Sequence, residues 1–168
     1  QRDRQAAYFA DPEGARVLLC SEIGSEGRNF QFAHHLILWD LPENPELVEQ
    51  RIGRLDRIGQ SSTIHIHLPY IQQSTEEVCV QFYHQGLGIF SHPVPTALIL
   101  SHQFSESLEK LGSQFDADAL DALISKVSTA RQELGEQLEN GYLRLLARNS
   151  NKPGRSQELI KQIQSTHT

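Results

Sequence analysis

The amino-acid sequence predicts an α/β fold over its first 70 residues, followed by a mostly α-helical extension. Three short apolar or alternating runs, at residues 16–20, 35–39 and 63–68, are bounded by turn residues and alternate with helical stretches. This order is typical of a parallel sheet with crossover helices. Beyond residue 70, apolar side chains recur at three- and four-residue intervals, as they do in amphipathic helices.

Three helices are expected in the first part, at about residues 3–10, 28–33 and 45–57. The third has the clearest start. Asn44 can accept an amide hydrogen bond as N-cap, Pro45 suits the first helical position, and Glu46 favours the positive end of the helix dipole. We predict that this helix ends at Ile58. Since three strands are few for a parallel sheet, we expect the remaining strands to lie outside this sequence.

The second part is predicted to be helical throughout. Ser74 to Glu77 form an S-x-x-E capping box, a second helix follows at residues 96–111, and the longest helix starts near Asp116. Its apolar stripe indicates packing against the same domain or a neighbour. A coiled-coil or partner-binding role is the less favoured interpretation, because Gln137 and Gly141 interrupt the stripe.

The organisation expected from these patterns is a first unit at residues 1–70 and a helical spacer at residues 71–168. The Asn, Ser, Pro and Gly content of residues 149–155 indicates a turn or linker. The sequence starts at Gln1 and holds no methionine, which we interpret as a segment of a larger protein.

Composition and charge limit the possible function classes. There is no run of eighteen apolar residues and no basic-then-apolar leader at the start, so we expect a cytosolic location without membrane contact. The net charge is −6 and each of residues 1–60 and 61–168 contributes −3. Because non-specific nucleic-acid binding relies on basic surfaces, any such contact must be local.

Metal and thiol chemistry is not indicated. Cys20 and Cys79 are far apart without CxxC spacing, and we expect both to be buried thiols. Adjacent His34 and His35, and alternating His65 and His67, have no carboxylate or thiol at ligand spacing, so no metal site is predicted. The sequence has no GxSxG elbow, so nucleophilic catalysis is not indicated.

Residues 50–60, QRIGRLDRIGQ, form the most informative block of the chain. On the predicted helix, Arg51, Arg54 and Arg57 would share about a third of the circumference and repel one another, so an anionic group should face them. One interpretation is solvation or salt bridging to nearby acidic residues. The other is a phosphate clamp, favoured by the planar guanidinium fork and by Gly53, which would permit close backbone approach. The acidic candidates are Glu46, Glu49 and Asp56.

This block resembles the last motif of superfamily-two helicases and translocases, Q-x-x-G-R-x-x-R, and its tail RIGQ resembles the Swi/Snf branch. The stretch LLCSEIGSEGRNFQFAHHLILWD resembles the preceding motif of that branch, with a Gly-containing loop between two strands. The residues that carry this second resemblance are Gly24, Gly27, Asn29, Trp39, Asp40, Asn44 and Pro45. The resemblance implies that residues 1–70 are the C-terminal half of a second RecA-like lobe.

The resemblance also implies roles for named residues. Arg54 and Arg57 would be arginine fingers that reach the γ-phosphate of ATP, and Gln50 would position a finger or the attacking water. ATP and Mg²⁺ would be bound mainly by the first RecA-like lobe of the same protein. No GxxxxGK[ST] loop or DExH-like box occurs in this sequence, so the full-length protein would hydrolyse ATP and this chain alone would not.

A loop that includes Gly24, Glu26, Gly27, Arg28 and Asn29 would couple the ATP state to contact with double-stranded DNA. The alternative interpretation of this loop is an ordinary strand-to-helix turn, which any α/β protein needs.

Glu26 and Arg28 stand where small or aliphatic residues are usual in eukaryotic remodellers, and Gly53 and Asp56 replace the more frequent Asp and His. These departures favour a bacterial member of the branch. The resemblance to the RNA polymerase-associated members of that branch implies that the protein binds the RNA polymerase core and promotes its recycling. Two alternatives stay open: another superfamily-two helicase or remodeller, or a non-catalytic helical module that docks a partner.

Overall fold

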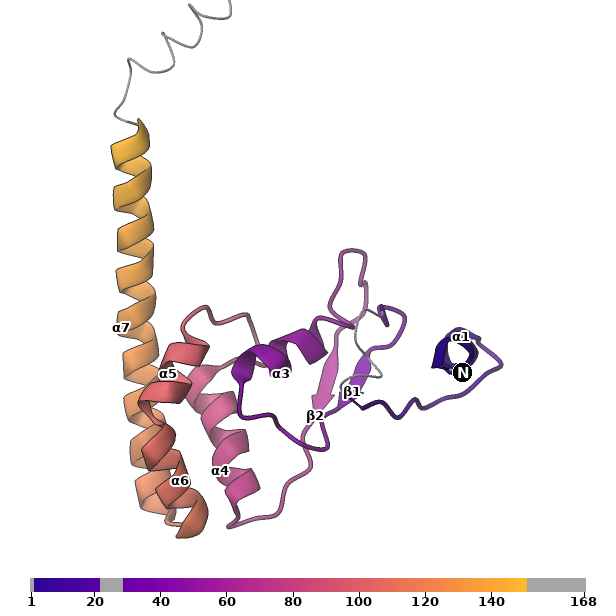
Figure 1. Cartoon of the computed structure of the whole chain (residues 1–168), viewed down its shortest axis with the longest axis horizontal. Coiled ribbons are helices and arrows are strands. Elements are labelled where there is room, and N and C mark those ends of the chain that lie inside the picture. The colour runs from indigo at the N-terminus through magenta and orange to yellow at the C-terminus, as the bar shows by residue number, and fades with distance from the viewer. Residues whose placement is uncertain (1, 22–28, 151–168) are drawn as a thin grey trace, which may run out of the picture.

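The computed structural model describes residues 2–21 and 29–150, and Figure 1 shows their arrangement. A small α/β part that contains a two-stranded sheet lies beside a helical part, whose last helix is much the longest. The elements, in chain order, are α1 (Arg2–Ala10), β1 (His35–Ile37), α3 (Pro45–Ile52), β2 (His65–His67), α4 (Thr75–Gln81), η1 (Phe82–Leu87), α5 (Ala97–Gln103), α6 (Ser105–Ser113) and α7 (Ala117–Ser150).

The two strands are parallel and directly adjacent, with His35 opposite His65 and Ile37 opposite His67. The chain passes through α3 between them, as a parallel connection requires. The central residues Leu36 and Ile66 are half-buried against the core, whereas the flanking residues of each strand are exposed. The predicted strands at 35–39 and 63–68 are therefore confirmed in shortened form, and the parallel sheet is confirmed.

Two elements of the sequence prediction are wrong. Residues 16–20 form no strand, and Val17 and Leu19 are 77% and 95% exposed, because this apolar run pairs with no other described segment. The described part of the predicted helix at 28–33 is a tight turn. The predicted three-stranded sheet is thus a two-stranded one.

Helix α3 begins as predicted and ends earlier. The Asn44 side-chain oxygen accepts a hydrogen bond from the Glu46 amide at 2.9 Å, and Pro45 occupies the first helical position. The helix stops at Ile52 rather than Ile58, with Gly53 as its C-cap. Glycine is a poor helix former, and the residues that follow it turn back towards other parts of the chain.

The predicted capping box at Ser74 and the predicted start of the longest helix near Asp116 are both confirmed. The Ser74 hydroxyl accepts the Glu77 amide at 3.3 Å at the start of α4, and the Asp116 carboxylate accepts the Ala119 amide at 2.8 Å at the start of α7. The single helix predicted at 96–111 is two helices, α5 and α6, separated at Phe104. Residues 149 and 150 of the predicted linker belong to the end of α7, and the others lie outside the described residues.

One hydrophobic core joins the two parts. Leu38 and Val48 from the α/β part pack in the same buried cluster as Val78 and Phe82 from the helical part. The first half of α7 closes this cluster through three buried residues, Leu120, Leu123 and Val127. Its second half extends beyond the other helices (Figure 1), and Leu138 and Tyr142 there are exposed.

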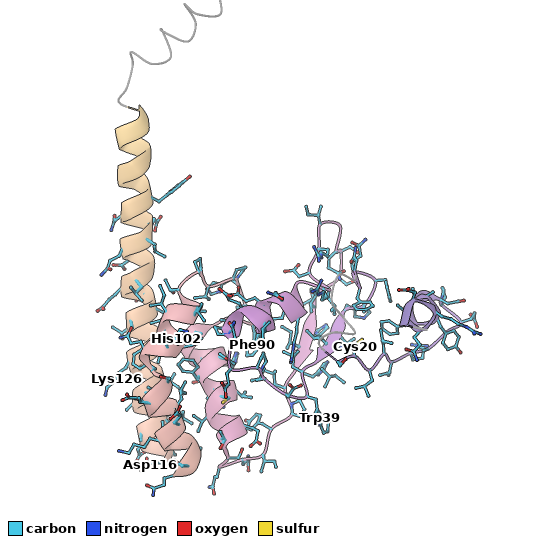
Figure 2. The ribbon with its side chains drawn as sticks, in the orientation of Figure 1. Cys20, Trp39, Phe90, His102, Asp116 and Lys126 are labelled. Atoms are coloured by element: carbon cyan, nitrogen blue, oxygen red, sulfur yellow. The ribbon has the colours of Figure 1, made fainter. Side chains whose placement is uncertain are left out.

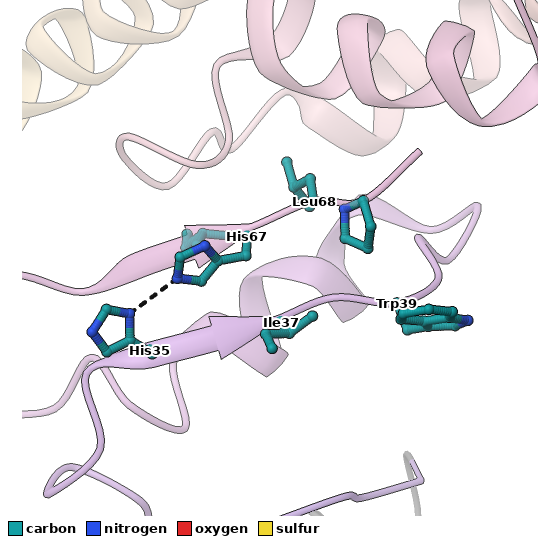
Figure 3. A pocket seen from close by; sticks show the side chains of 7 residues that line it. His35, Ile37, Trp39, His67 and Leu68 are labelled. Carbon is teal, nitrogen blue, oxygen red and sulfur yellow. Dashed lines mark hydrogen bonds between the residues drawn. The ribbon is translucent and has the colours of Figure 1, made fainter. Parts of the chain in front are cut away.

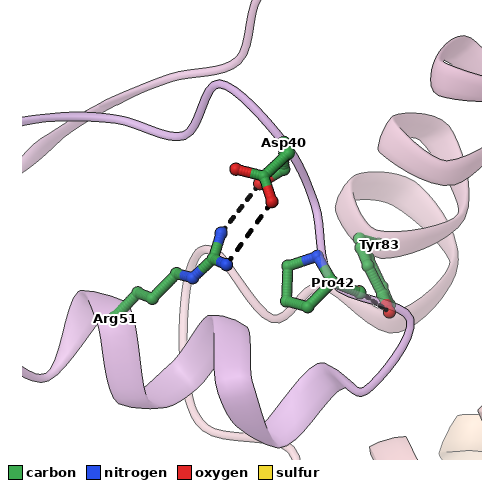
Figure 4. A network of polar contacts seen from close by, with 4 residues as sticks. All are labelled: Asp40, Pro42, Arg51 and Tyr83. Carbon is green, nitrogen blue, oxygen red and sulfur yellow. Dashed lines mark hydrogen bonds and ion pairs between the residues drawn. The ribbon is translucent and has the colours of Figure 1, made fainter. Parts of the chain in front are cut away.

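Polar contacts reinforce the junction. The Tyr83 hydroxyl, on η1, lies 2.7 Å from the carbonyl oxygen of Pro42, just before α3 (Figure 4). It also lies 2.8 Å from the carbonyl oxygen of Glu43. Burial raises the pKa of Tyr83 well above its ordinary value of 10, with smaller contributions from Cys79 and Glu43. The segment that leads into α3 is thereby held against the helical part.

The cysteines differ from the expectation in one case. Cys20 is exposed and lies in the segment that forms no strand (Figure 2), so the prediction that it is buried is wrong. Cys79 is partly buried, and burial followed by the charges of Glu76 and Glu43 raises the pKa of its thiol. Across residues 2–21 and 29–150, no helix is both long enough and apolar enough to span a membrane.

Candidate functional site

The arginine block forms a turn at the end of α3, which we call the finger turn (residues 53–60). Its first half is closed by hydrogen bonds from the amides of Arg54, Leu55 and Asp56 to carbonyls at the end of α3. Its second half is a β-turn closed by the Gln60 amide and the Arg57 carbonyl at 2.9 Å. Gly59, at the third position of that turn, has a φ of 98°, which favours glycine.

The turn corrects the picture of three arginines on one helix face. Only Arg51 lies on α3, because Arg54 and Arg57 follow the end of the helix. Gly53 also has a different role from the one predicted. It is the C-cap, and the described atoms nearest to an added Cβ there are carbonyl oxygens of α3 itself.

Arg54 and Arg57 have no ion pair or side-chain hydrogen bond with any residue in the described ranges. Arg54 is half-buried and Arg57 is exposed. The salt bridges considered for these two arginines do not form. The Glu49 carboxylate instead accepts the Val94 amide at 2.8 Å. Both guanidinium groups are therefore available to an anionic group from outside the described structure.

Arg51 behaves differently from the other two arginines. Its guanidinium group donates to the Asp40 carbonyl at 2.8 Å and lies 3.6 Å from the Asp40 carboxylate (Figure 4). This pair joins the end of the β1 segment to α3. Gln50, the remaining predicted catalytic residue, is exposed on the last turn of α3.

A second turn lies against the finger turn, and we call it the bridging turn (residues 29–33). The Asn29 side chain accepts the Gln31 amide at 3.0 Å, and the Ala33 amide donates to the Phe30 carbonyl at 2.8 Å. The Phe30 amide donates to the Arg54 carbonyl at 2.9 Å, which connects the two turns directly. Behind them, Phe30 packs edge-on to Phe9 of α1, with ring centroids 6.2 Å apart.

The Gln60 side chain makes further contacts between the two turns. Its amide nitrogen lies 2.9 Å from the Gln31 carbonyl and 3.3 Å from the Ala33 carbonyl. Gln60 is the last residue of the RIGQ tail, and no role was predicted for it from the sequence. The Gly-Gln order of that tail was the available sequence signal, because the backbone turn at Gly59 determines where the Gln60 side chain points.

The predicted DNA-coupling loop (residues 24–29) can be placed only at its end. Gly24, Glu26, Gly27 and Arg28 lie outside the described residues, whereas Asn29 is described and is the first residue of the bridging turn. The loop therefore runs directly into the turn that contacts the finger turn.

The histidines gather on the exposed side of the sheet. Figure 3 shows a shallow pocket lined by His35, Ile37, Trp39, His67 and neighbouring residues. The His35 Nδ1 and His67 Nε2 atoms are 3.0 Å apart. Desolvation, followed by repulsion from neighbouring histidines, lowers the pKa of His35. Within the described parts of the chain, no group of three or more His, Cys, Asp or Glu side chains is arranged to hold a metal ion.

Comparison with known proteins divides the chain close to the end of the finger turn. Residues 1–59 match the family described as "Helicase conserved C-terminal domain". The fold is accordingly part of a RecA-like lobe followed by a helical extension. Residues 63–168 match the family described as "RNA polymerase recycling family C-terminal". Since this match covers more than half of the sequence, the chain belongs to the RNA polymerase recycling family.

Several curated relatives are similar over nearly the whole chain. The RNA polymerase-associated protein RapA of Pseudomonas putida strain GB-1 is 53% identical over 164 residues, which are 97% of this chain and 17% of that protein. The proteins of the same name from Pseudomonas fluorescens strain Pf0-1 and Pseudomonas aeruginosa strain LESB58 are 52% and 50% identical, over 97% and 98% of this chain. The chain spans 17% of the length of these relatives.

Proposed function

We propose that this chain is the part of a nucleic-acid-dependent ATPase that supplies arginine fingers from its second RecA-like lobe. The two guanidinium groups on the finger turn carry this proposal, because they have no partner in the described structure. Arg54 and Arg57 would stabilise negative charge on the phosphoryl group in the transition state. Gln50, which is exposed on the preceding helical turn, would position a finger or the attacking water.

The other half of the active site would come from the first RecA-like lobe. That lobe would hold most of the contacts to ATP and Mg²⁺, since the present sequence has no phosphate loop or DExH-like box. Hydrolysis would drive movement along double-stranded DNA. The coupling loop, which includes Gly24, Glu26, Gly27, Arg28 and Asn29, would contact the DNA backbone.

The partner of the intact protein would be the RNA polymerase core, whose recycling it would promote in the bacterial cytoplasm. This part of the proposal is supported by the matching family and by the names of the relatives, which are called RNA polymerase-associated proteins. Leu138 and Tyr142, which are exposed on α7, leave apolar surface available to a partner.

The arginine fingers are tested by Arg54→Ala and Arg54→Lys in the full-length protein. We expect both variants to lower kcat for DNA-stimulated ATP hydrolysis by about a thousandfold, with a much smaller change in the KM for ATP. Lysine should not substitute, because it lacks the planar fork. Steady-state kinetics with duplex DNA measure both constants.

Arg4→Ala is the matched control, because Arg4 is an exposed arginine on α1 and is not part of the finger turn. Its kinetics should equal those of the unmodified protein. Normal ATP hydrolysis by Arg54→Ala would show that Arg54 is not a finger.

A further inference from the structure

Gln60 is the side chain through which the finger turn and the bridging turn are most extensively connected. Its amide nitrogen lies 2.9 Å from the Gln31 carbonyl and 3.3 Å from the carbonyls of Ala33 and Leu55. Its amide oxygen accepts the Ser62 amide at 3.0 Å. Three carbonyls on one side and an N–H on the other define the orientation of the side-chain amide.

These partners belong to different parts of the site. Leu55 is in the finger turn, whereas Gln31 and Ala33 are in the bridging turn and lie 29 and 27 residues away from Gln60 in the sequence. The amide group is half-buried, so water competes only partly for these hydrogen bonds. The positive φ of Gly59 directs the chain so that the Gln60 side chain enters the space between the turns.

Apolar packing stabilises the same region independently of Gln60. Leu55 and Phe30 are both buried, and Phe30 also contacts Phe9. Loss of the Gln60 amide would therefore remove the side-chain hydrogen bonds between the turns, whereas the backbone hydrogen bond from Phe30 to Arg54 and the burial of Leu55 and Phe30 would remain. This separation makes it possible to test a role in coupling apart from a role in folding.

We propose that Gln60 is a positioning residue that couples the bridging turn to the finger turn, which carries Arg54 and Arg57. The inference rests on the proposed function, in which DNA contacts residues 24–29. Asn29 is the first residue of the bridging turn, so a shift of Asn29 on contact with DNA would reach Gln31 and Ala33, which lie two and four residues further along the chain. Gln60 then passes the displacement across its hydrogen bonds to Leu55, next to Arg54.

The experiment compares Gln60→Leu and Gln60→Glu with the unmodified full-length protein. Leucine has a similar size and removes both polar atoms of the Gln60 side chain. Glutamate keeps the oxygen that accepts the Ser62 amide, but it replaces the NH2 donor with an oxygen that the three carbonyls repel. ATP hydrolysis is measured with and without duplex DNA. We expect the ratio of stimulated to unstimulated kcat to fall about tenfold in both variants. The KM for ATP and the affinity for DNA should change by about twofold or less.

Gln72→Glu is the control, since Gln72 is an exposed turn residue outside the site, and its stimulation ratio should be unchanged. An equal loss of kcat with and without DNA would overturn the proposal, because Gln60 would then only hold the fingers in place. Unchanged ratios in both variants would overturn it as well. If Gln60→Leu unfolds in a thermal melt, Gln60→Glu decides the question alone.

The failure of the underlying function has a different signature. In that case the unmodified protein itself would show no DNA stimulation of ATP hydrolysis, whereas failure of the Gln60 proposal leaves that stimulation intact.

Discussion

Gly59 shows how one residue shapes the site. Its φ of 98° lies in the left-handed region, where an L side chain costs about 1–2 kcal/mol. An added Cβ at Gly59 would meet no described atom within 4 Å, so the requirement for glycine comes from the backbone rather than from crowding. The positive φ allows the Gln60 amide to return to the Arg57 carbonyl and close the turn.

At the residue scale, Gly59→Ala and Gly135→Ala should therefore have opposite effects on stability. Gly135 lies inside α7 with no described atom within 4 Å of an added Cβ and without a positive φ. Alanine there should stabilise the chain by about 0.5–1 kcal/mol through helix propensity, whereas Gly59→Ala should destabilise it by about 1 kcal/mol. Urea denaturation of each variant measures the free energy of unfolding. Equal shifts of the same sign would refute the conformational explanation.

At the scale of elements, structure that depends on neighbouring residues could be predicted from the sequence, whereas structure that depends on distant contacts could not. The start of α3 at Asn44 and Pro45 depends on cap chemistry within three residues, and the sequence predicted it correctly. The end of α3 depends on Gly53 and on a hydrogen bond from Phe30, which is distant in the sequence. The regular arginine spacing predicted a longer helix, but the helix ends at Ile52, and the Arg54 carbonyl accepts a hydrogen bond from the Phe30 amide.

The same distinction explains the candidate site. Arg54 and Arg57 could be proposed from their motif, because the relevant spacing is local. The role of Gln60 could not, since two of its partners lie 27 and 29 residues away. The apolar run at 16–20 predicted a strand from composition alone, but a strand also requires a neighbour, and no described segment pairs with this run.

Helix α7 has buried leucines in its first half and an exposed leucine further along, so we expect substitution by alanine to change stability differently at the two places. Leu123 is 5% exposed in the shared core, whereas Leu138 is 53% exposed on the projecting half. Leu123→Ala should lower the free energy of unfolding by about 2–5 kcal/mol, and Leu138→Ala by about 0.5 kcal/mol or less. Chemical denaturation of the two variants provides the comparison. A large loss in Leu138→Ala would show that the outer half of α7 packs in solution.

At the scale of the whole molecule, the finger turn is attached to a hydrophobic core that both parts of the chain share. The core that includes Leu38, Val48, Val78 and Phe82 joins the α/β part to the helical part, and Tyr83 reinforces this junction. The finger turn follows α3, which packs in this core through Val48 and is held to the β1 segment by the hydrogen bond from Arg51 to the Asp40 carbonyl. The two arginines of the finger turn, Arg54 and Arg57, have no partner in residues 2–21 and 29–150, so their counterion would come from another part of the full-length protein or from a ligand.

This division of labour predicts that the 168-residue chain alone will not hydrolyse ATP. Arginine fingers stabilise charge on a phosphoryl group that other residues must bind, and neither a phosphate loop nor an acidic Mg²⁺ box occurs in the sequence. The purified chain should therefore release no more phosphate than its own Arg54→Ala variant, with Mg²⁺ and with or without duplex DNA. The full-length protein in the same assay confirms that the conditions support turnover. Mg²⁺-dependent hydrolysis that disappears with Arg54→Ala would place a complete active site in this chain, and the fingers would then act within it rather than across a cleft.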